Sequence, residues 1–139
     1  MAEMKLAHIG YVVRNIERSV ERFEKEGATL LIAAAPDPVQ GVYVALLRIE
    51  DEVDIELVSP IVVGESPVDS RLSRGGGLDH LCYFVADVQS ALEAEQSNGG
   101  IVVCHPTFAC VFEREIGFVQ RRSGLVVEFM SDVKVLNGD

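Results

Sequence analysis

The sequence contains no tryptophan and few cysteine and basic residues, and these shortages narrow the possible functions. Its 12 lysines and arginines stand against 22 acidic residues, so the net charge is −10. Nucleic acid requires a basic face to neutralise its phosphates, and an anionic membrane surface would repel this chain. No apolar run approaches the roughly 18 residues of a membrane-spanning helix. We therefore expect neither nucleic acid nor a membrane as a partner.

The three cysteines, Cys82, Cys104 and Cys110, are odd in number and form no CxxC or other zinc-binding spacing. We expect them to be reduced thiols. The first residues also lack the apolar core of a signal peptide, so the expected location is cytoplasmic. With 139 residues, 48% of them apolar, the chain is long enough for one compact unit or two very small ones packed together.

One internal repeat organises most of the chain. The phrase LAHIGYVV near the start returns as LDHLCYFV, which moves His8 onto His80 (80 − 8 = 72). Farther along, VDIELVS matches LVVEFMS, and Glu56 falls on Glu128 by the same shift (128 − 56 = 72). A single shift that holds at both ends of a segment indicates a duplicated structural unit.

Each copy predicts the element order β-α-β-β-β, which makes the chain an α+β protein. An apolar run is followed by helical spacing and then by three more strand-like runs. Asn15 and Asp87 are candidate helix N-caps. The expected domains are a first module (1–59), a linker with one or two helical turns (60–77) and a second module (78–139). The expected strands are 6–13, 28–34, 41–49 and 53–59, then 78–85, 100–104, 114–121 and 124–130, and the expected helices are 16–26 and 88–98.

Four polar side chains lie at equivalent strand positions: His8, Glu56, His80 and Glu128. A lone histidine in an apolar strand is ordinarily a core residue, and a lone glutamate ordinarily points to solvent. Two of each obeying one shift are better explained as a metal site, because a buried carboxylate must be paired or bound to a metal. Two imidazoles and two carboxylates suit a divalent ion such as Co, Ni, Zn, Mn or Fe(II).

This pattern resembles the vicinal oxygen chelate superfamily, whose members include glyoxalase I, extradiol dioxygenases and metal-free bleomycin-binding proteins. The resemblance covers almost the whole chain. It implies two tandem βαβββ modules that form a cupped, barrel-like mixed sheet around a metal site, and a homodimer. The positions that match the superfamily's metal ligands are His8, Glu56, His80 and Glu128.

Within the superfamily the chain looks most like methylmalonyl-CoA epimerase. IELVSP (55–60) and ESPVDSRLSRGGGLDHLCYFVADV (65–88) follow the order and spacing of the epimerase strand end, linker helix and histidine strand. Some epimerases carry a catalytic glutamate in the third strand, where this chain has Val44. FACV (108–111) also replaces a GAHG-like loop, and Asp79 replaces a second histidine. These departures leave the substrate open.

The resemblance implies a proton transfer next to a carbonyl group held by the metal. With Val44 in the strand position, the expected base is Glu128 and then Glu56, while Glu113 and Glu115 fit solvated strand-edge charges better. The expected substrate is a small molecule, either an acyl-CoA or another carbonyl compound. Acyl-CoA phosphates would need cations, for which the candidates are Arg71, Arg74, Arg121 and Arg122. A glyoxalase I-like lyase is the alternative enzyme, and a drug-binding protein without catalysis is the alternative of another class.

Overall fold

A computed structural model describes residues 4–135 of the chain. It divides into two compact units, one from His8 to Asp79 and one that joins the start of the chain, through Ala7, to the residues from His80 onward. The module boundaries expected at residues 59 and 78 stay predictions, and their outermost residues, 1–3 and 136–139, lie outside the described residues.

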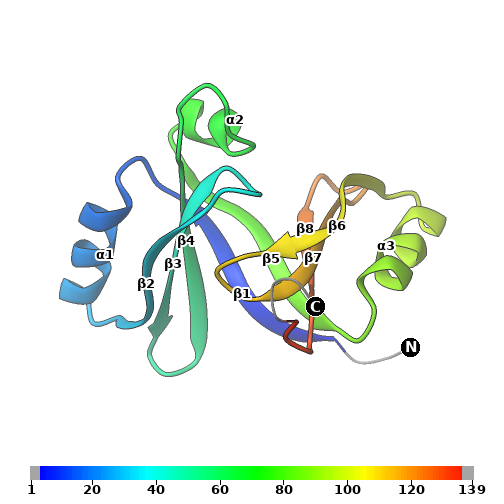
Figure 1. Ribbon diagram of the computed structural model, residues 1–139, viewed down its shortest axis with the longest axis horizontal. Helices are drawn as coiled ribbons and strands as arrows, with labels where there is room; N and C mark the ends of the chain where they lie inside the picture. Colours follow the sequence, from blue (N-terminus) through cyan, green and yellow to red (C-terminus); the bar gives the residue numbers. More distant parts are fainter. Residues whose placement is uncertain (1–3, 136–139) are drawn as a thin grey trace. The chain divides into compact units, whose positions relative to one another are not determined.

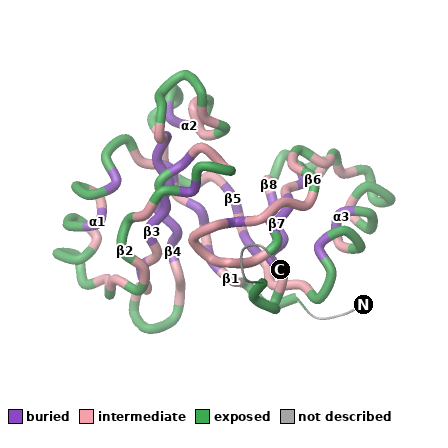
Figure 2. Tube along the Cα trace, viewed as in Figure 1, coloured by how far each residue is buried: buried purple, intermediate pink, exposed green. Residues whose placement is uncertain are grey.

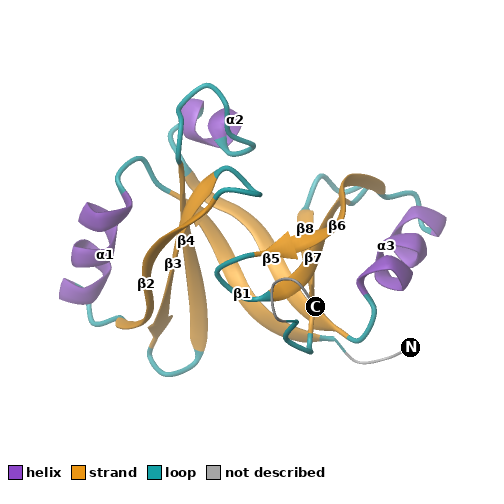
Figure 3. Cartoon of the chain, viewed as in Figure 1, coloured by secondary structure: helices purple, strands orange, loops and turns teal. Residues whose placement is uncertain are grey.

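The first module contains four strands and one long helix (Figures 1 and 3). Its strands lie in the order β2-β3-β4-β1. β1 and β4 are parallel, whereas β3 pairs antiparallel with both β2 and β4. A short helix, α2 (Asp69–Ser73), follows within the predicted linker. The bounds are β1 Lys5–Val12, α1 Ile16–Lys25, β2 Thr29–Asp37, β3 Val42–Ile49 and β4 Val53–Pro60.

The second module repeats this topology with the strand order β5-β8-β7-β6. β5 and β8 are parallel, and β7 pairs antiparallel with β6 and β8. The predicted α+β class and the duplicated β-α-β-β-β order are therefore confirmed. The bounds are β5 Gly77–Val85, α3 Val88–Ser97, β6 Ile101–Ala109, β7 Arg114–Gln120 and β8 Val126–Ser131.

Both long helices begin at the predicted caps. The side chain of Asn15 accepts a hydrogen bond from the backbone N–H of Arg18 at 3.1 Å, and Asp87 accepts one from Ser90 at 3.0 Å. Each cap satisfies a backbone donor that the first helical turn leaves without a partner. Within residues 4–135 no helix is both long and apolar enough to span a membrane.

The outer strands of both modules are longer than predicted. β2 continues to Asp37 and β6 to Ala109, whereas the expected strands stopped at residues 34 and 104. Both extensions contain a proline, Pro36 or Pro106, which an outer strand tolerates because one side of its backbone needs no sheet partner. Register shifts in both strands accommodate the extra residues.

Figure 2 shows buried residues along the strands of each module, and the way these residues pack determines which way the glutamates point. In β4, Ile55 and Leu57 pack in a cluster with helix α1 residues, so Glu56, between them, lies on the opposite face of the sheet. In β8, Val127 and Phe129 pack in a cluster with helix α3 residues, so Glu128 also faces away from its helix. The alternation of each strand thus places a buried carboxylate of each module on the face of its sheet away from the long helix.

Candidate metal centre

The first module holds a buried histidine–glutamate pair. His8 lies in β1 and Glu56 in the adjacent parallel strand β4, where Gly10 is opposite Glu56. His8 Nε2 lies 3.4 Å from Glu56 Oε1. The two residues are only 2% and 6% exposed. A carboxylate this far from water requires a polar partner, and the imidazole of the neighbouring strand provides one.

The second module holds the matching pair. His80 Nε2 lies 3.0 Å from Glu128 Oε1, and the residues are 6% and 2% exposed. His80 also packs edge-on against Phe118, with ring centroids 5.2 Å apart and an interplanar angle of 85°. This contact with an aromatic ring limits how far the imidazole can turn while it faces Glu128.

The two glutamates occupy equivalent cross-strand rows. Glu56 lies across from Leu46, which in turn lies across from Ile32. Glu128 lies across from Phe118, which lies across from Cys104. All three positions are related by the shift of the sequence repeat (56 + 72 = 128, 46 + 72 = 118, 32 + 72 = 104). The repeat is therefore preserved in strand register around both carboxylates.

The thiol of Cys104, in the same row as Glu128, is affected by the charge of that carboxylate. Burial raises the pKa of its thiol above the ordinary value, and the negative charge of Glu128 raises it further. Both effects disfavour the thiolate. Neither Cys104 nor Phe118 was among the predicted site residues, although their places in the row follow from the alternation of strand residues once the register is known.

The predicted ligands are thus brought together pairwise, His8 with Glu56 and His80 with Glu128. Each module contributes one imidazole nitrogen and one carboxylate oxygen from its sheet. These buried His and Glu donors could hold a metal ion, and the combination is of the kind that borderline transition metals prefer.

Other candidate residues are placed less favourably. Glu115, considered as an alternative base, is exposed on β7. Val44 is 4% exposed and lies across from Val58, two residues along β4 from Glu56. It therefore lies on the same face as Glu56, and no carboxylate comes from this point of β3.

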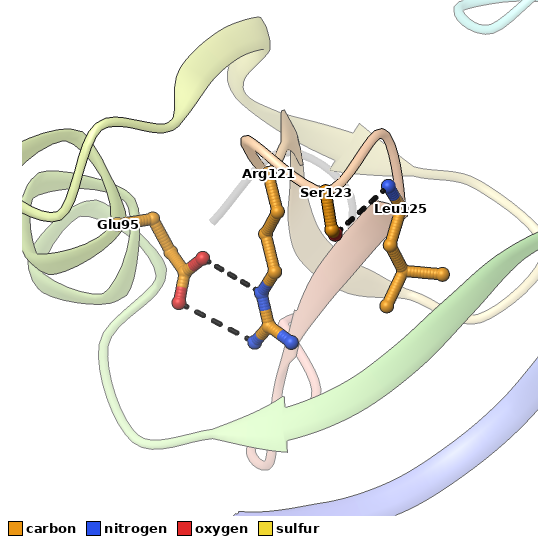
Figure 4. A network of polar contacts seen from close by, with 4 residues as sticks. All are labelled: Glu95, Arg121, Ser123 and Leu125. Atoms are coloured by element: carbon orange, nitrogen blue, oxygen red, sulfur yellow. Dashed lines mark hydrogen bonds and ion pairs between the residues drawn. The ribbon is translucent and has the colours of Figure 1, made fainter.

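The cations considered for acyl-CoA phosphates are partly engaged with acidic residues. Arg121 donates two hydrogen bonds to the carboxylate of Glu95, at 2.9 and 3.4 Å (Figure 4). The Nε atom of Arg71 lies 3.8 Å from a carboxylate oxygen of Asp79. A phosphate at Arg121 would have to compete with a bidentate, partly buried ion pair.

Comparison with known proteins identifies a family and solved structures of similar fold. Residues 7–118 match the family model of the Glyoxalase/Bleomycin resistance protein/Dioxygenase superfamily. A hypothetical protein from Bacillus halodurans C-125 is 25% identical, with a TM-score of 0.82 over 99% of this chain and 100% of that one. No curated protein matches the chain.

Two solved methylmalonyl-CoA epimerases have a similar fold. The enzyme from Mycobacterium tuberculosis is 22% identical, with a TM-score of 0.80 over 92% of this chain and 87% of that one. A variant of the Streptomyces coelicolor enzyme, solved with 2-nitronate-propionyl-CoA, is also 22% identical, with a TM-score of 0.82 over 96% and 98%. At this identity the likeness is one of fold.

Proposed function

We propose that this chain, which belongs to the glyoxalase/bleomycin resistance protein/dioxygenase superfamily, is a divalent-metal-dependent enzyme that moves a proton on the carbon next to a carbonyl group. One observation carries the proposal, the buried His–Glu pair at the same position in both modules. A structural role would explain one such pair, but both modules retain it although their other residues have diverged.

In this proposal His8, Glu56, His80 and Glu128 hold one ion together. They offer two imidazole nitrogens and two carboxylate oxygens, and all four residues are buried. Four donors leave room for substrate or water on Co, Ni, Zn, Mn or Fe(II). When bound, such an ion acts as a Lewis acid that lowers the cost of removing the adjacent proton.

Glu128 is the proposed base, with Glu56 as the second candidate. Its carboxylate oxygen would take the proton from the substrate carbon and return it. His80 keeps that carboxylate in position through the 3.0 Å contact, and Phe118 supports His80. Phe118 and Cys104, the neighbours of Glu128 in its cross-strand row, are half-buried, whereas Glu128 itself is buried.

The proposed reaction is the epimerisation of an acyl-CoA, in which the proton leaves one face of the carbon and returns to the other. Support comes from the epimerases of similar fold, one of which was solved with methylmalonyl-CoA and NH4+. A glyoxalase-type reaction would use the same donors, so the substrate distinguishes the two. The expected homodimer and cytoplasmic location belong to this proposal and depend on the resemblance alone.

The first test is elemental analysis of the full chain purified without chelators. We expect about one divalent ion per chain in the wild type and a large loss in Glu128→Ala and in Glu56→Ala. Glu115→Ala removes an exposed carboxylate from the neighbouring strand and should leave the metal content unchanged. A wild-type chain that stays metal-free after reconstitution would contradict the proposal.

The second test follows deuterium incorporation into an acyl-CoA in D2O. Glu128→Gln keeps an oxygen donor but cannot accept the proton, so exchange should fall by about 10²–10⁴-fold while part of the metal is retained. If Glu56→Gln abolishes exchange and Glu128→Gln does not, the base is Glu56. A metal-free chain that binds a ligand tightly without exchange would instead favour the drug-binding alternative.

A further inference from the structure

A groove in the first module contains an unusual share of the protein's positive charge. It has a volume of about 1140 Å³ and is lined by residues of α1, the end of β1 and the loop 75–77. Four of the 12 basic residues of this acidic chain line it: Arg14, Arg18, Arg22 and Lys25. Glu21 is the single acidic residue among the lining residues. The groove is therefore a cationic region on a protein of net charge −10.

Within the described part of the chain, the side chains of these cations take part in no ion pair, although Arg22 and Lys25 lie in the last turn of α1, where a positive charge favours the helix. Arg48 and Arg121 are held by Asp54 and Glu95, but among residues 4–135 no ion pair or side-chain hydrogen bond engages the four groove cations. All four are exposed. Arg18 and Arg22 stand four residues apart on α1, a spacing at which like charges destabilise a helix.

The second module provides an internal comparison. The shift of the repeat places Arg14 on Ala86, Arg18 on Ser90, Arg22 on Ala94 and Lys25 on Ser97 (14 + 72 = 86, 18 + 72 = 90, 22 + 72 = 94, 25 + 72 = 97). All four equivalents are small and neutral, whereas the buried helix positions stay apolar in both copies. The equivalent helix thus packs on the equivalent sheet without any of these cations.

The volume of the groove is sufficient for a small-molecule ligand. Ligand pockets typically measure roughly 300–1,000 Å³, close to the volume of this open groove. Gly76 has a φ of 74°, and a Cβ at this position would lie 2.6 Å from the carbonyl oxygen of Val12. The loop can therefore lie against the end of β1 only because it has no side chain there.

We propose that this groove binds the phosphates of a diphosphate-bearing small molecule. Arginine matches phosphate oxygens through two parallel N–H groups, and Arg18 and Arg22 present two such groups side by side on α1. The groove lies on the α1 side of the sheet, whereas His8 and Glu56 lie on the other face. The site therefore does not depend on the proposed proton transfer, and either idea can fail alone.

The ligand could be the nucleotide end of coenzyme A or a free diphosphate, since both present the same chemistry. Isothermal titration of the full chain with inorganic pyrophosphate and with coenzyme A distinguishes them. If both probes bind at one site per chain and Arg18→Ser with Arg22→Ala weakens both, the ligand is the nucleotide end of coenzyme A, because a coenzyme A bound only at the proposed metal site would not respond to these changes. Pyrophosphate binding alone would indicate a free diphosphate ligand. Either result supports the site if binding also weakens with added salt.

The deciding variant transfers the second module's residues into the first, as Arg18→Ser with Arg22→Ala. We expect the dissociation constant for pyrophosphate to rise by about tenfold or more. The control, Lys5→Gln with Lys134→Gln, also removes two positive charges, but from exposed positions outside the groove. Its dissociation constant for pyrophosphate should stay within about twofold of the wild-type value. A circular dichroism spectrum would check that both double variants are folded.

Three outcomes would overturn the proposal. The first is no saturable binding of either probe at low salt. The second is equal affinity in the wild type and the Arg18→Ser/Arg22→Ala variant. The third is binding to phosphatidylserine vesicles without binding to pyrophosphate, which would identify the groove as a membrane-contact surface instead.

Discussion

Gly117 gives the sharpest test of how closely helix and sheet pack in the second module. It lies in β7 across from Phe129, beneath α3. A Cβ added there would lie 2.9 Å from Leu92 Cδ1, 3.1 Å from Val88 Cγ1 and 3.2 Å from the carbonyl oxygen of Cys104. Leu92 and Val88 would have to shift their side chains, and the carbonyl oxygen of Cys104 belongs to the backbone and yields less easily. We therefore predict that Gly117→Ala is destabilising.

The expected magnitude combines two opposing effects. Overpacking a core by one methyl group costs about 1–3 kcal/mol. Replacing glycine by alanine also reduces the conformational entropy of the unfolded chain, which stabilises by about 0.4–1 kcal/mol. The net loss should be about 1–2 kcal/mol in the free energy of unfolding. Urea denaturation of the chain with chelator present measures this loss without a contribution from metal binding.

The first module suggests how the loss could be recovered. Its residue equivalent to Gly117 is Ala45, which is 0% exposed, and the helix residue equivalent to Leu92 is Val20 (45 + 72 = 117, 20 + 72 = 92). Alanine is accommodated there although Ile16, the equivalent of Val88 (16 + 72 = 88), is larger by one carbon, so the shorter residue at the Leu92 position is the change that can make room for it. Leu92→Val should cost clearly less in the Gly117→Ala background than in the wild type, with a coupling of more than about 0.5 kcal/mol.

Two results would refute this reasoning. One is a Gly117→Ala variant as stable as the wild type. The other is a Leu92→Val cost that is the same in both backgrounds. Ala45→Gly, the reverse change in the first module, serves as the control and should cost about 1 kcal/mol through the lost methyl group and the flexibility of glycine.

Two further predictions concern Cys104 and the helix caps. Because burial and the charge of Glu128 raise the pKa of the Cys104 thiol, its alkylation should reach half-maximal rate at a higher pH than that of a free thiol. Glu128→Gln should lower that midpoint in part. Alkylation is followed by mass spectrometry in a Cys110→Ser chain. A wild-type midpoint at or below the free-thiol value would contradict a raised pKa of Cys104. Asp87→Ala should cost about 1 kcal/mol in urea denaturation, whereas Asp87→Asn keeps the acceptor and should stay near the wild type; equal losses would argue against the capping role.

The repeat made the candidate site residues predictable from the sequence. One constant shift identifies the strands that carry Glu56 and Glu128, and their apolar neighbours show that both face away from the helices. The pairing of each glutamate with a histidine could not be predicted from the repeat alone. It depends on β1 lying beside β4 and β5 beside β8, which local sequence does not encode.

Features that depend on distant contacts were not predictable. Arg121 is separated by 26 residues from Glu95, its partner, so it looked free for a phosphate. The extension of β2 and β6 past Pro36 and Pro106 was not predicted. Proline locally disfavours a strand, but it is tolerated in an outer strand, and whether a strand is an outer one depends on distant pairing. The packing of Phe118 against His80 likewise depends on strand register.

The prolines in the outer strands also bear on how the protein resists aggregation. Among the described strands, β2 pairs only with β3, and β6 only with β7, so each has one backbone edge without a neighbour inside its module. Such edges can recruit strands from other molecules. Pro36 and Pro106 remove one donor from each edge, and the register shifts disturb its regular spacing. A chain with two copies of one sheet would otherwise have two similar edges to which strands of other molecules could add. In both copies a proline and a register shift in the outer strand oppose this addition.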